Sequence, residues 1–186
     1  MDDVQIQSHD NYFVIAGGPG AGKTTLIDAL SKRGEACVPE SGRAIILDQV
    51  RIGGRALPWL DAALYAELML ARHLANYRAF SDLSARVFFD HALASLAGYL
   101  RLVGLPILSH VGRAATILRY NPLVFMAPPW KAIYVNDAER KQTFAEAVAT
   151  FQAVRDAYVE QGYQPLELPL ASVEARVSFV LDNVGT

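Results

Sequence analysis

A glycine-rich segment near the start of the chain has the residue types and spacing of a phosphate-binding loop. Residues 17–24 read Gly-Gly-Pro-Gly-Ala-Gly-Lys-Thr and fit the pattern G-x-x-x-x-G-K-[S/T]. Glycines let consecutive backbone N–H groups converge on an anion, and a lysine at the position of Lys23 reaches the outer phosphates of a nucleotide. The hydroxyl of Thr24 suits Mg²⁺ beside those phosphates. The sequence therefore predicts a nucleoside triphosphate site formed by Gly18, Pro19, Gly20, Ala21, Gly22, Lys23, Thr24 and Thr25.

Asp90 is the candidate acidic partner for the metal ion. It directly follows the apolar run Val87-Phe88-Phe89, and an aspartate at the end of a strand can orient Mg²⁺ and its waters. Capping of the following helix is the alternative role for this aspartate. The histidines His73, His91 and His110 have no close metal-ligand spacing, so we expect Mg²⁺ to be held by Thr24, Asp90 and the phosphates.

Glu40 and Arg43 are the candidate residues for binding a second substrate. They follow a second apolar run, Ala36 to Pro39, and would face an acceptor molecule across the phosphate loop. Glu40 would accept a hydrogen bond from an acceptor hydroxyl group, and Arg43 would hold an anionic group. A solvated ion pair is the alternative for these two side chains.

Further cations are candidates for neutralising a phosphoryl group during transfer. Arg140 and Lys141 stand in a charged patch, Asp137 to Lys141, and would close over the phosphates as a lid, while Arg119 would approach from a neighbouring loop. An exposed helical face is the alternative for the charged patch. The predicted catalytic residues are Lys23, Asp90, Glu40 and Arg140, and the predicted substrate-binding residues are Glu40, Arg43 and Arg119.

The elements that must position these residues alternate between short apolar runs and longer helical patterns. This alternation is typical of an α/β fold with a mostly parallel sheet and crossover helices. We expect a helix that begins at Pro58. Its aromatic side chains Trp59, Tyr65 and Tyr77 should pack in the core of the protein. The predicted strands are 12–16, 36–39, 86–89, 123–127 and 164–168, and the predicted helices are 22–34, 44–53, 58–80, 92–103, 111–118, a helix from the charged patch to about 161, and 172–181.

Length and composition favour one soluble domain over residues 1–186. The 17 basic residues do not exceed the 19 acidic ones, so the chain lacks the cationic excess of a nucleic-acid-binding protein. No stretch approaches the roughly 20 apolar residues of a membrane span, and residues 1–10 do not resemble a secretory signal. Cys37 is expected to be a buried, inert thiol. The expected location is the cytoplasm.

The sequence outside the phosphate loop bears on the nucleotide and on the reaction class. An Asn/Thr-Lys-x-Asp guanine signature is absent from the sequence, so ATP is the expected nucleotide. The leading hypothesis is a kinase that transfers the terminal phosphate of ATP to a small nucleoside-like or other hydroxyl-bearing metabolite. The alternatives are a regulatory ATP-binding module that acts through a protein partner and a slow ATP hydrolase. Fold class alone does not decide between them.

Several short stretches together resemble a known family. They are Phe13 to Thr25, Val38 to Arg43, Ala56 to Trp59, Phe88 to Asp90, Ala127 to Trp130, Asp137 to Arg140 and Leu168 to Val177. On these stretches, nearly the whole chain is similar to the small AAA-type P-loop ATPases of bacteria related to nicotinamide-riboside-kinase-like proteins. The resemblance implies a three-layer, kinase-like P-loop fold with a five-stranded parallel sheet in the order 2-3-1-4-5. It also implies ATP and Mg²⁺ at Lys23, Thr24 and Asp90.

The chain departs from the family pattern directly after Asp90. The pattern continues with Arg-Gly and a later Asp, whereas this chain has His91 and Ala92, with Ser95 at the position of the later acid. An arginine there would contact the acceptor or a phosphate, and histidine lacks the permanent charge of arginine. Histidine in place of this arginine is expected to affect phosphate transfer more than nucleotide binding.

Overall fold

The computed structural model describes residues 5–134 and 143–185. Its elements, in chain order, are β1 (Gln7–Ser8), β2 (Tyr12–Gly17), α1 (Lys23–Lys32), β3 (Ala36–Val38), α2 (Ser41–Ile52), α3 (Ala62–Ala79), β4 (Val87–Asp90), α4 (Leu93–Leu102), α5 (Ser109–Ile117), β5 (Leu118–Arg119), β6 (Leu123–Ala127), the 3-10 helix η1 (Lys131–Ile133), α6 (Phe144–Glu160), β7 (Gln164–Glu167) and α7 (Val173–Asn183).

The main sheet has five parallel strands in the order β3-β4-β2-β6-β7. Counted along the chain within this sheet, the order is 2-3-1-4-5, as the family resemblance implies. All six residues of β2, the central strand, are buried, which explains why Tyr12–Gly17 is a continuous run without polar alternation. The register pairs Ile15 of β2 with Asp90 of β4, so the carboxyl ends of these two strands lie side by side.

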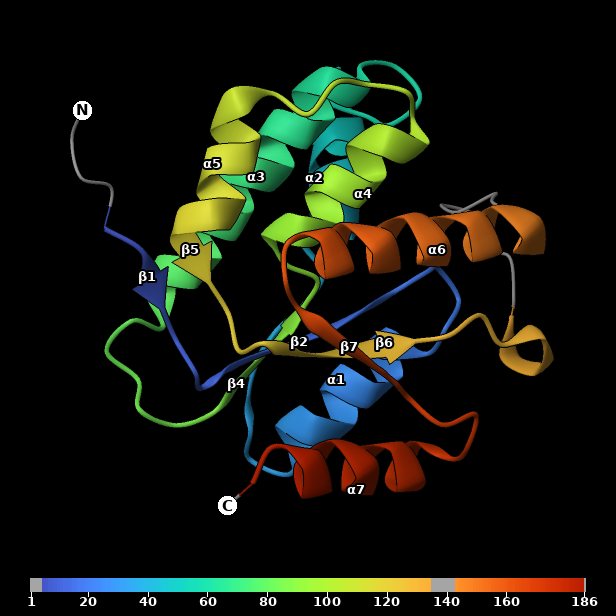
Figure 1. The fold of residues 1–186 in the computed structure, drawn as a ribbon. Coiled ribbons are helices and arrows are strands. Elements are labelled where there is room, and N and C mark those ends of the chain that lie inside the picture. The colour runs from blue at the N-terminus through green and yellow to red at the C-terminus, as the bar shows by residue number, and fades with distance from the viewer. Residues whose placement is uncertain (1–4, 135–142, 186) are drawn as a thin grey trace.

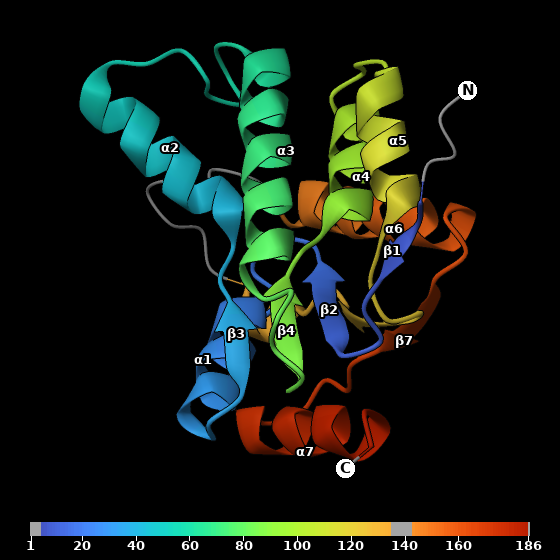
Figure 2. The same ribbon diagram turned by 90° about the vertical axis from the view of Figure 1, so that its left-hand side faces the viewer.

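Helices cover both faces of the sheet and make three layers (Figure 1). Helices α1 and α7 pack together on one face, while α6 lies across the other face and contacts α4. Helices α2, α3, α4 and α5 project from the sheet on the same side as α6 (Figure 2). Two buried apolar clusters correspond to the two faces, one centred on Val14, Phe89 and Met126 and the other on Ile15, Leu26 and Phe125.

Two helix starts differ from the predictions. Helix α3 begins at Ala62 rather than at Pro58, because Asp61 caps it by accepting a hydrogen bond from the backbone N–H of Leu64 at 3.0 Å. Helix α2 begins at Ser41 rather than at Ala44, with Glu40 at its N-cap position. Arg43 is therefore a first-turn helical residue.

A second, two-stranded sheet was not predicted. It consists of β1 and β5, which pair in parallel through Gln7 and Leu118. The hydroxyl of Tyr77 donates toward the carbonyl oxygens of Gln7 and Arg119, at 2.9 and 3.0 Å, and so joins α3 to both strands. The strands are only two residues long and have no apolar alternation, which leaves no sequence signal.

Helix α6 begins at Phe144, and Thr143 and Glu146 form a capping box at its start. The predicted charged patch, Asp137 to Lys141, lies outside the described residues. The final helix, α7, is capped by Ser172 as the sequence indicates. None of the helices in the described part of the chain has the length and apolarity needed to cross a membrane.

Candidate functional site

The phosphate loop connects the central strand β2 to helix α1. Gly20 and Gly22 have φ angles of 69° and 77°, a left-handed region in which a side chain would strain the backbone. These two angles direct the loop around the N-terminus of α1, where backbone N–H groups are unpaired by the helix. Lys23 is only 5% exposed, and its Nζ donates to the carbonyl oxygen of Gly18 at 2.8 Å. The lysine is thus held across the loop.

The loop is packed closely against its neighbours. A Cβ atom at Gly17 would lie 2.4 Å from the carbonyl oxygen of Ala127 at the end of β6, and one at Gly18 would lie 2.5 Å from the carbonyl oxygen of Ala147 on α6. Neither position can hold a larger residue without moving the backbone. The glycine pair therefore allows β6 and α6 to approach the start of the loop.

Asp90 is placed beside the loop by the sheet. It ends β4, is only 3% exposed, and pairs with Ile15, two residues before the loop begins. Ala92 is the N-cap residue of α4, so Asp90 lies two residues before the helix cap. Its Oδ1 lies 4.0 Å from Nε2 of His91.

His91 has an unusual backbone conformation. Its φ angle of 67° is the one positive φ among the described residues other than glycine, and such strain is concentrated at functional sites. The Nδ1 atom of His91 lies 2.8 Å from the hydroxyl oxygen of Ser95, which in turn lies 2.9 Å from the hydroxyl of Tyr158. Burial raises the pKa of Tyr158, so this phenol is a neutral hydrogen-bond partner. The chain of contacts fixes the imidazole ring at the edge of a cavity.

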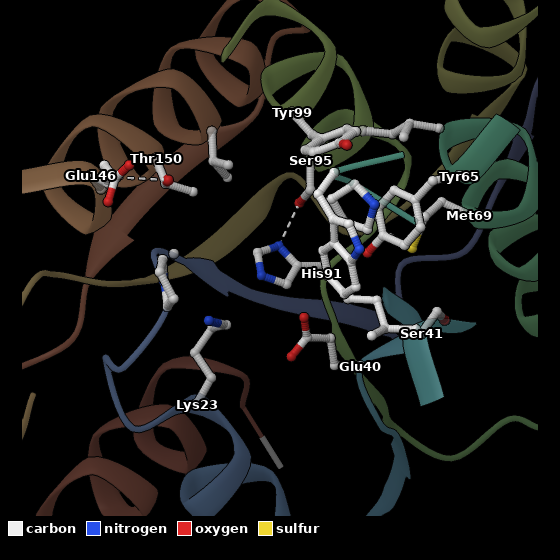
Figure 3. A pocket seen from close by; sticks show the side chains of 17 residues that line it. Lys23, Glu40, Ser41, Tyr65, Met69, His91, Ser95, Tyr99, Glu146 and Thr150 are labelled. Carbon is white, nitrogen blue, oxygen red and sulfur yellow. Dashed lines mark hydrogen bonds between the residues drawn. The ribbon is translucent and has the colours of Figure 1, made fainter. Parts of the chain in front are cut away.

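A cavity of about 420 Å³, which we call the helix-side cavity, opens between the phosphate loop and helices α2, α3, α4 and α6 (Figure 3). Its polar side chains come from four directions, with Lys23 on the loop, Glu40 and Ser41 at the start of α2, His91 and Ser95 before and on α4, and Glu146 and Thr150 on α6. The remaining lining side chains are apolar or aromatic: Pro19, Ile46, Pro58, Trp59, Tyr65, Met69, Leu96, Tyr99 and Val154.

A second cavity of about 650 Å³, the loop-side cavity, lies on the other side of the loop, toward α7. Arg176 forms part of its wall and is only 2% exposed. This guanidinium donates to the carbonyl oxygens of Ala21 at 2.8 Å and Pro169 at 3.0 Å, and its Cζ lies 5.4 Å from the ring centroid of Trp130. The other lining residues are Gly20, Ala21, Gly22, Lys23, Thr24, Thr25, Arg43, Trp130, Ile133, Ala171, Ser172, Val173 and Glu174.

Lys23 lines both cavities. A nucleotide whose phosphates lie on the loop can therefore occupy the loop-side cavity while its terminal phosphate faces the helix-side cavity. The helix-side cavity offers room for a molecule that would receive a phosphoryl group, with Glu40 and His91 in its wall. In Figure 3 the side chains of Lys23, Glu40 and His91 converge on the same space.

The structure separates the predicted substrate-binding residues. Glu40 lines the helix-side cavity, whereas Arg43 lines the loop-side cavity. Arg119 lines neither cavity and donates to the carbonyl oxygen of Gln161 at 2.8 Å, with its guanidinium 4.2 Å from the ring centroid of Tyr163. Arg140 lies outside the described residues.

The residues around the loop fit Mg²⁺ only together with a nucleotide. Within residues 5–134 and 143–185, no group of three or more histidine, cysteine or acidic side chains could hold a metal ion by itself. Thr24 follows Lys23 at the start of α1, and Asp90 is buried at the end of the adjacent strand. A hydroxyl and a carboxylate leave most of the octahedral positions of Mg²⁺ to phosphate oxygens and water.

Several residues of the two cavities were missed by the sequence interpretation. Trp59 was expected in the core, but it is 59% exposed and lines the helix-side cavity. Tyr65 is buried, as expected, and also contributes to the wall of this cavity. Tyr77 does lie in the core. Arg176 was missed although it lies within the quoted stretch Leu168 to Val177. The available signal was its spacing, since Arg176 lies four residues before Val180 and beside Val177 on the buried face of α7.

Comparison with known proteins places these features in a family. A family model described as an AAA domain matches residues 12–176, which include the phosphate loop, Asp90 and Arg176. None of the curated protein sequences matches the chain.

Solved structures share the fold at low sequence identity. A deoxyadenosine kinase from M. mycoides with bound dATP has a TM-score of 0.66 and 11% identity, with 93% of this chain and 98% of that chain covered. A thymidylate kinase from Candida albicans has a TM-score of 0.63 and 11% identity, with 93% and 90% covered. The NadR protein in complex with NR has a TM-score of 0.64 and 17% identity, with 94% of this chain and 51% of that chain covered. The fold is that of a P-loop kinase.

Proposed function

We propose that this chain, which belongs to the AAA domain family, is a kinase that transfers the terminal phosphate of ATP to a hydroxyl group of a small metabolite. The observation that carries the proposal is the position of Lys23, whose side chain lines two separate cavities. A hydrolase needs space only for the nucleotide and water. A kinase needs a second cavity at the terminal phosphate, and the helix-side cavity supplies it.

The proposed donor site is the loop-side cavity. Backbone N–H groups of the loop and the side chains of Lys23 and Arg43 would bind the phosphates of ATP. Thr24 and Asp90 would hold Mg²⁺, which when bound neutralises charge on the outer phosphates. Trp130 and Arg176 would flank the base. Arg140 keeps its predicted role as a cation over the phosphates.

The proposed transfer step takes place at Lys23. The acceptor hydroxyl oxygen forms a bond to the terminal phosphorus, the bond from that phosphorus to the bridging oxygen breaks, and ADP leaves. Glu40 holds the acceptor hydroxyl by a hydrogen bond and receives its proton. Lys23 stabilises the negative charge that develops on the phosphoryl oxygens and the bridging oxygen. His91 adds a hydrogen-bonding group to the same wall.

Nucleoside-like acceptors are the first class to test, since the fold is shared with a deoxyadenosine kinase and with NadR in complex with NR. The protein is incubated with Mg²⁺ and ATP labelled at its terminal phosphate, together with a panel of nucleosides and other small alcohols. The proposal predicts label in a phosphorylated acceptor. Label found only in inorganic phosphate would indicate a slow ATP hydrolase, and label remaining in ATP would indicate a regulatory ATP-binding module; either result would contradict the kinase.

A further inference from the structure

We propose, on the premise of the kinase function above, that Ser95 and Tyr158 are positioning residues that fix the tautomer of His91. The two nitrogens of a neutral imidazole have opposite roles, so the contact of one nitrogen sets what the other presents. The two hydroxyl groups hold Nδ1 of His91 as a hydrogen-bond acceptor, and the ring then has its proton on Nε2. His91 therefore offers a hydrogen-bond donor to the helix-side cavity, suited to an oxygen of the transferred phosphoryl group or of the acceptor.

The imidazole ring of His91 is held by one strand and two helices. Its backbone N–H donates to the carbonyl oxygen of Ile15 on β2 at 3.0 Å, which anchors the residue despite its φ angle of 67°. Its Nδ1 lies 2.8 Å from Oγ of Ser95 on α4, and this Oγ lies 2.9 Å from the hydroxyl of Tyr158 on α6. Figure 3 shows the second ring nitrogen on the side of Lys23.

The hydroxyl proton of Tyr158 needs an acceptor inside the protein, because this side chain is fully buried. Burial raises the pKa of Tyr158 and outweighs the hydrogen bonds with Ser95 and with the backbone of Ala92, which lower it, so the phenol keeps its proton. A backbone bond lowers the pKa of a phenol when an N–H group donates it, so Ala92 does not accept the proton. Among the described residues, the acceptor is Oγ of Ser95.

The direction of the remaining bond follows from this one. Since Tyr158 donates to Oγ of Ser95, the serine proton is free to be donated to its other partner, Nδ1 of His91. With the proton on Nδ1 instead, Ser95 would donate to Tyr158 and the phenol proton would be buried without an acceptor, a costly state. Nε2 of His91 lies 4.0 Å from Oδ1 of Asp90, and a nearby carboxylate also favours a proton on this nitrogen.

Ser95 differs in its hydroxyl contact from two other helical residues of the described chain. The hydroxyls of Thr116 and Thr150 donate to the carbonyl oxygen four residues earlier in their own helices, at 3.0 and 2.8 Å. The hydroxyl of Ser95 is turned toward His91 and Tyr158 instead. Its buried neighbours on α4 are leucine, alanine and glycine, so packing alone would be served by alanine. The contact with His91 accounts for a hydroxyl group at this buried position.

The fixed tautomer matters at the place where transfer is proposed. His91 lines the helix-side cavity together with Lys23 and Glu40. An N–H group on this wall stabilises the negative charge that develops on phosphoryl oxygens during transfer. The other tautomer would present a lone pair to the same oxygens and would oppose that charge. Loss of the two hydroxyls should therefore lower kcat more than it changes the KM for ATP.

Ring-nitrogen NMR tests the tautomer without any need for activity. The protein is labelled with ¹⁵N-histidine and measured at about pH 8, above the ordinary histidine pKa. Loss of signals in His91→Gln identifies those of His91. We expect a protonated Nε2 and an unprotonated Nδ1, and a mixture of both tautomers in Ser95→Ala. A proton on Nδ1 of the parent protein, or an unchanged tautomer in Ser95→Ala, would overturn the proposal whether or not the protein is a kinase.

Kinetics of hydroxyl variants test the consequence for transfer. Ser95→Ala should lower kcat at least about 10-fold with the KM for ATP unchanged, the scale on which outer partners of a site act. Tyr158→Phe should lower kcat less, because Ser95 can still donate to His91. Ser95→Thr keeps the hydroxyl and should restore kcat relative to Ser95→Ala. Parental kcat in a folded Ser95→Ala protein would contradict the role of His91 as a donor.

Tyr120 provides the matched control for the loss of a buried phenol hydroxyl. It is 3% exposed, and its hydroxyl has no hydrogen-bond partner within the described structure. Tyr120→Phe therefore removes the same atom from a similar environment and should leave both kcat and the tautomer of His91 unchanged. Thermal unfolding of each variant reports folding. Equal losses of kcat in folded Tyr120→Phe and Tyr158→Phe proteins would contradict a specific role for the hydroxyl of Tyr158.

Discussion

The two cavities that meet at Lys23 are built in opposite ways. The loop-side cavity is lined by loop backbone and by the cations Lys23, Arg43 and Arg176. The helix-side cavity is lined by residues of four helices and is largely aromatic and apolar, with Glu40 among its few charged groups. In the proposed kinase, the loop-side cavity would bind the phosphates of ATP and the helix-side cavity would bind the acceptor.

Substitution of Lys23 is expected to have the largest effect, because this residue belongs to both cavities. Lys23→Ala removes the one cation that faces the terminal phosphate from the loop, and transfer should fall about 100-fold or more, with weaker ATP binding in calorimetry. Lys32→Ala, an exposed substitution at the other end of α1, is the control. Unchanged ATP affinity in a folded Lys23→Ala protein would refute the loop assignment.

The second-largest effect is expected for Asp90→Asn, and it should be limited to Mg²⁺-dependent turnover. The amide keeps the shape of the carboxylate but loses its charge, so Mg²⁺-dependent turnover should fall about 100-fold, with a smaller change in metal-free nucleotide binding. Asp28→Asn on the exposed face of α1 is the matched control. Titration of turnover against Mg²⁺ concentration measures the effect. An Asp90→Asn protein with the activity and Mg²⁺ requirement of the parent would exclude Asp90 as a metal partner.

A packing change should affect the helix-side cavity alone. A Cβ at Gly98 on α4 would lie 2.9 Å from the carbonyl oxygen of Ala153 and from Cα of Val154 on α6. Gly98→Ala should push these helices apart, lower the free energy of unfolding by about 2 kcal/mol, and raise the acceptor KM while the affinity for ATP stays constant. Denaturant unfolding and steady-state kinetics measure the two effects.

The control for this change lies on α5. A Cβ atom at Gly112 would have no other atom within 4 Å, so Gly112→Ala should raise the free energy of unfolding by about 0.5–1 kcal/mol. If Gly98→Ala weakened ATP binding as much as acceptor binding, the two cavities would not be separable.

The smallest predicted effect concerns His73, a buried histidine on α3. Burial lowers the pKa of His73 to about 4, against 6.5 in the unfolded chain, and its Nε2 has no partner within the described structure. Below pH 6.5 the unfolded chain takes up a proton that the folded chain does not, so the free energy of unfolding falls as the pH drops toward 4. Between pH 7 and 5.5 this group should cost about 1 kcal/mol.

His73→Leu should remove that loss, as measured by urea unfolding at the two pH values. His110→Gln is the control, because His110 lies on the surface beside Glu67. A His73→Leu protein with the pH dependence of the parent would mean that His73 is protonated in the folded state, and hence that α3 is hydrated at this point.

The same contrast explains how much could be predicted from the sequence. The phosphate loop is one continuous segment, and its strand and helix neighbours carry strong apolar patterns, so the loop residues follow from local sequence, whereas the strand order was available only from the family resemblance. Asp90 follows too, because it ends a buried strand. The helix-side cavity is assembled from Glu40, Tyr65, Tyr99 and Thr150, which lie on different helices and meet only through tertiary packing.

Arg119 lies away from both cavities. An arginine near a loop has the chemistry to bind phosphate, but its backbone and ring contacts with Gln161 and Tyr163 use that chemistry inside the fold. Nothing in the local sequence distinguishes the two uses. Trp59 is a similar case, since an aromatic residue beside a proline is compatible with the core and with a cavity mouth alike.

The most direct test of the two-cavity arrangement is a crystal structure with a non-hydrolysable ATP analogue, Mg²⁺ and a nucleoside. We predict the terminal phosphate at Lys23 where the two cavities meet, the base of the ATP analogue beside Trp130 and Arg176, and the nucleoside in the helix-side cavity with its hydroxyl at Glu40. A nucleotide base in the helix-side cavity, or a terminal phosphate away from Lys23, would contradict the assignment of donor and acceptor sites.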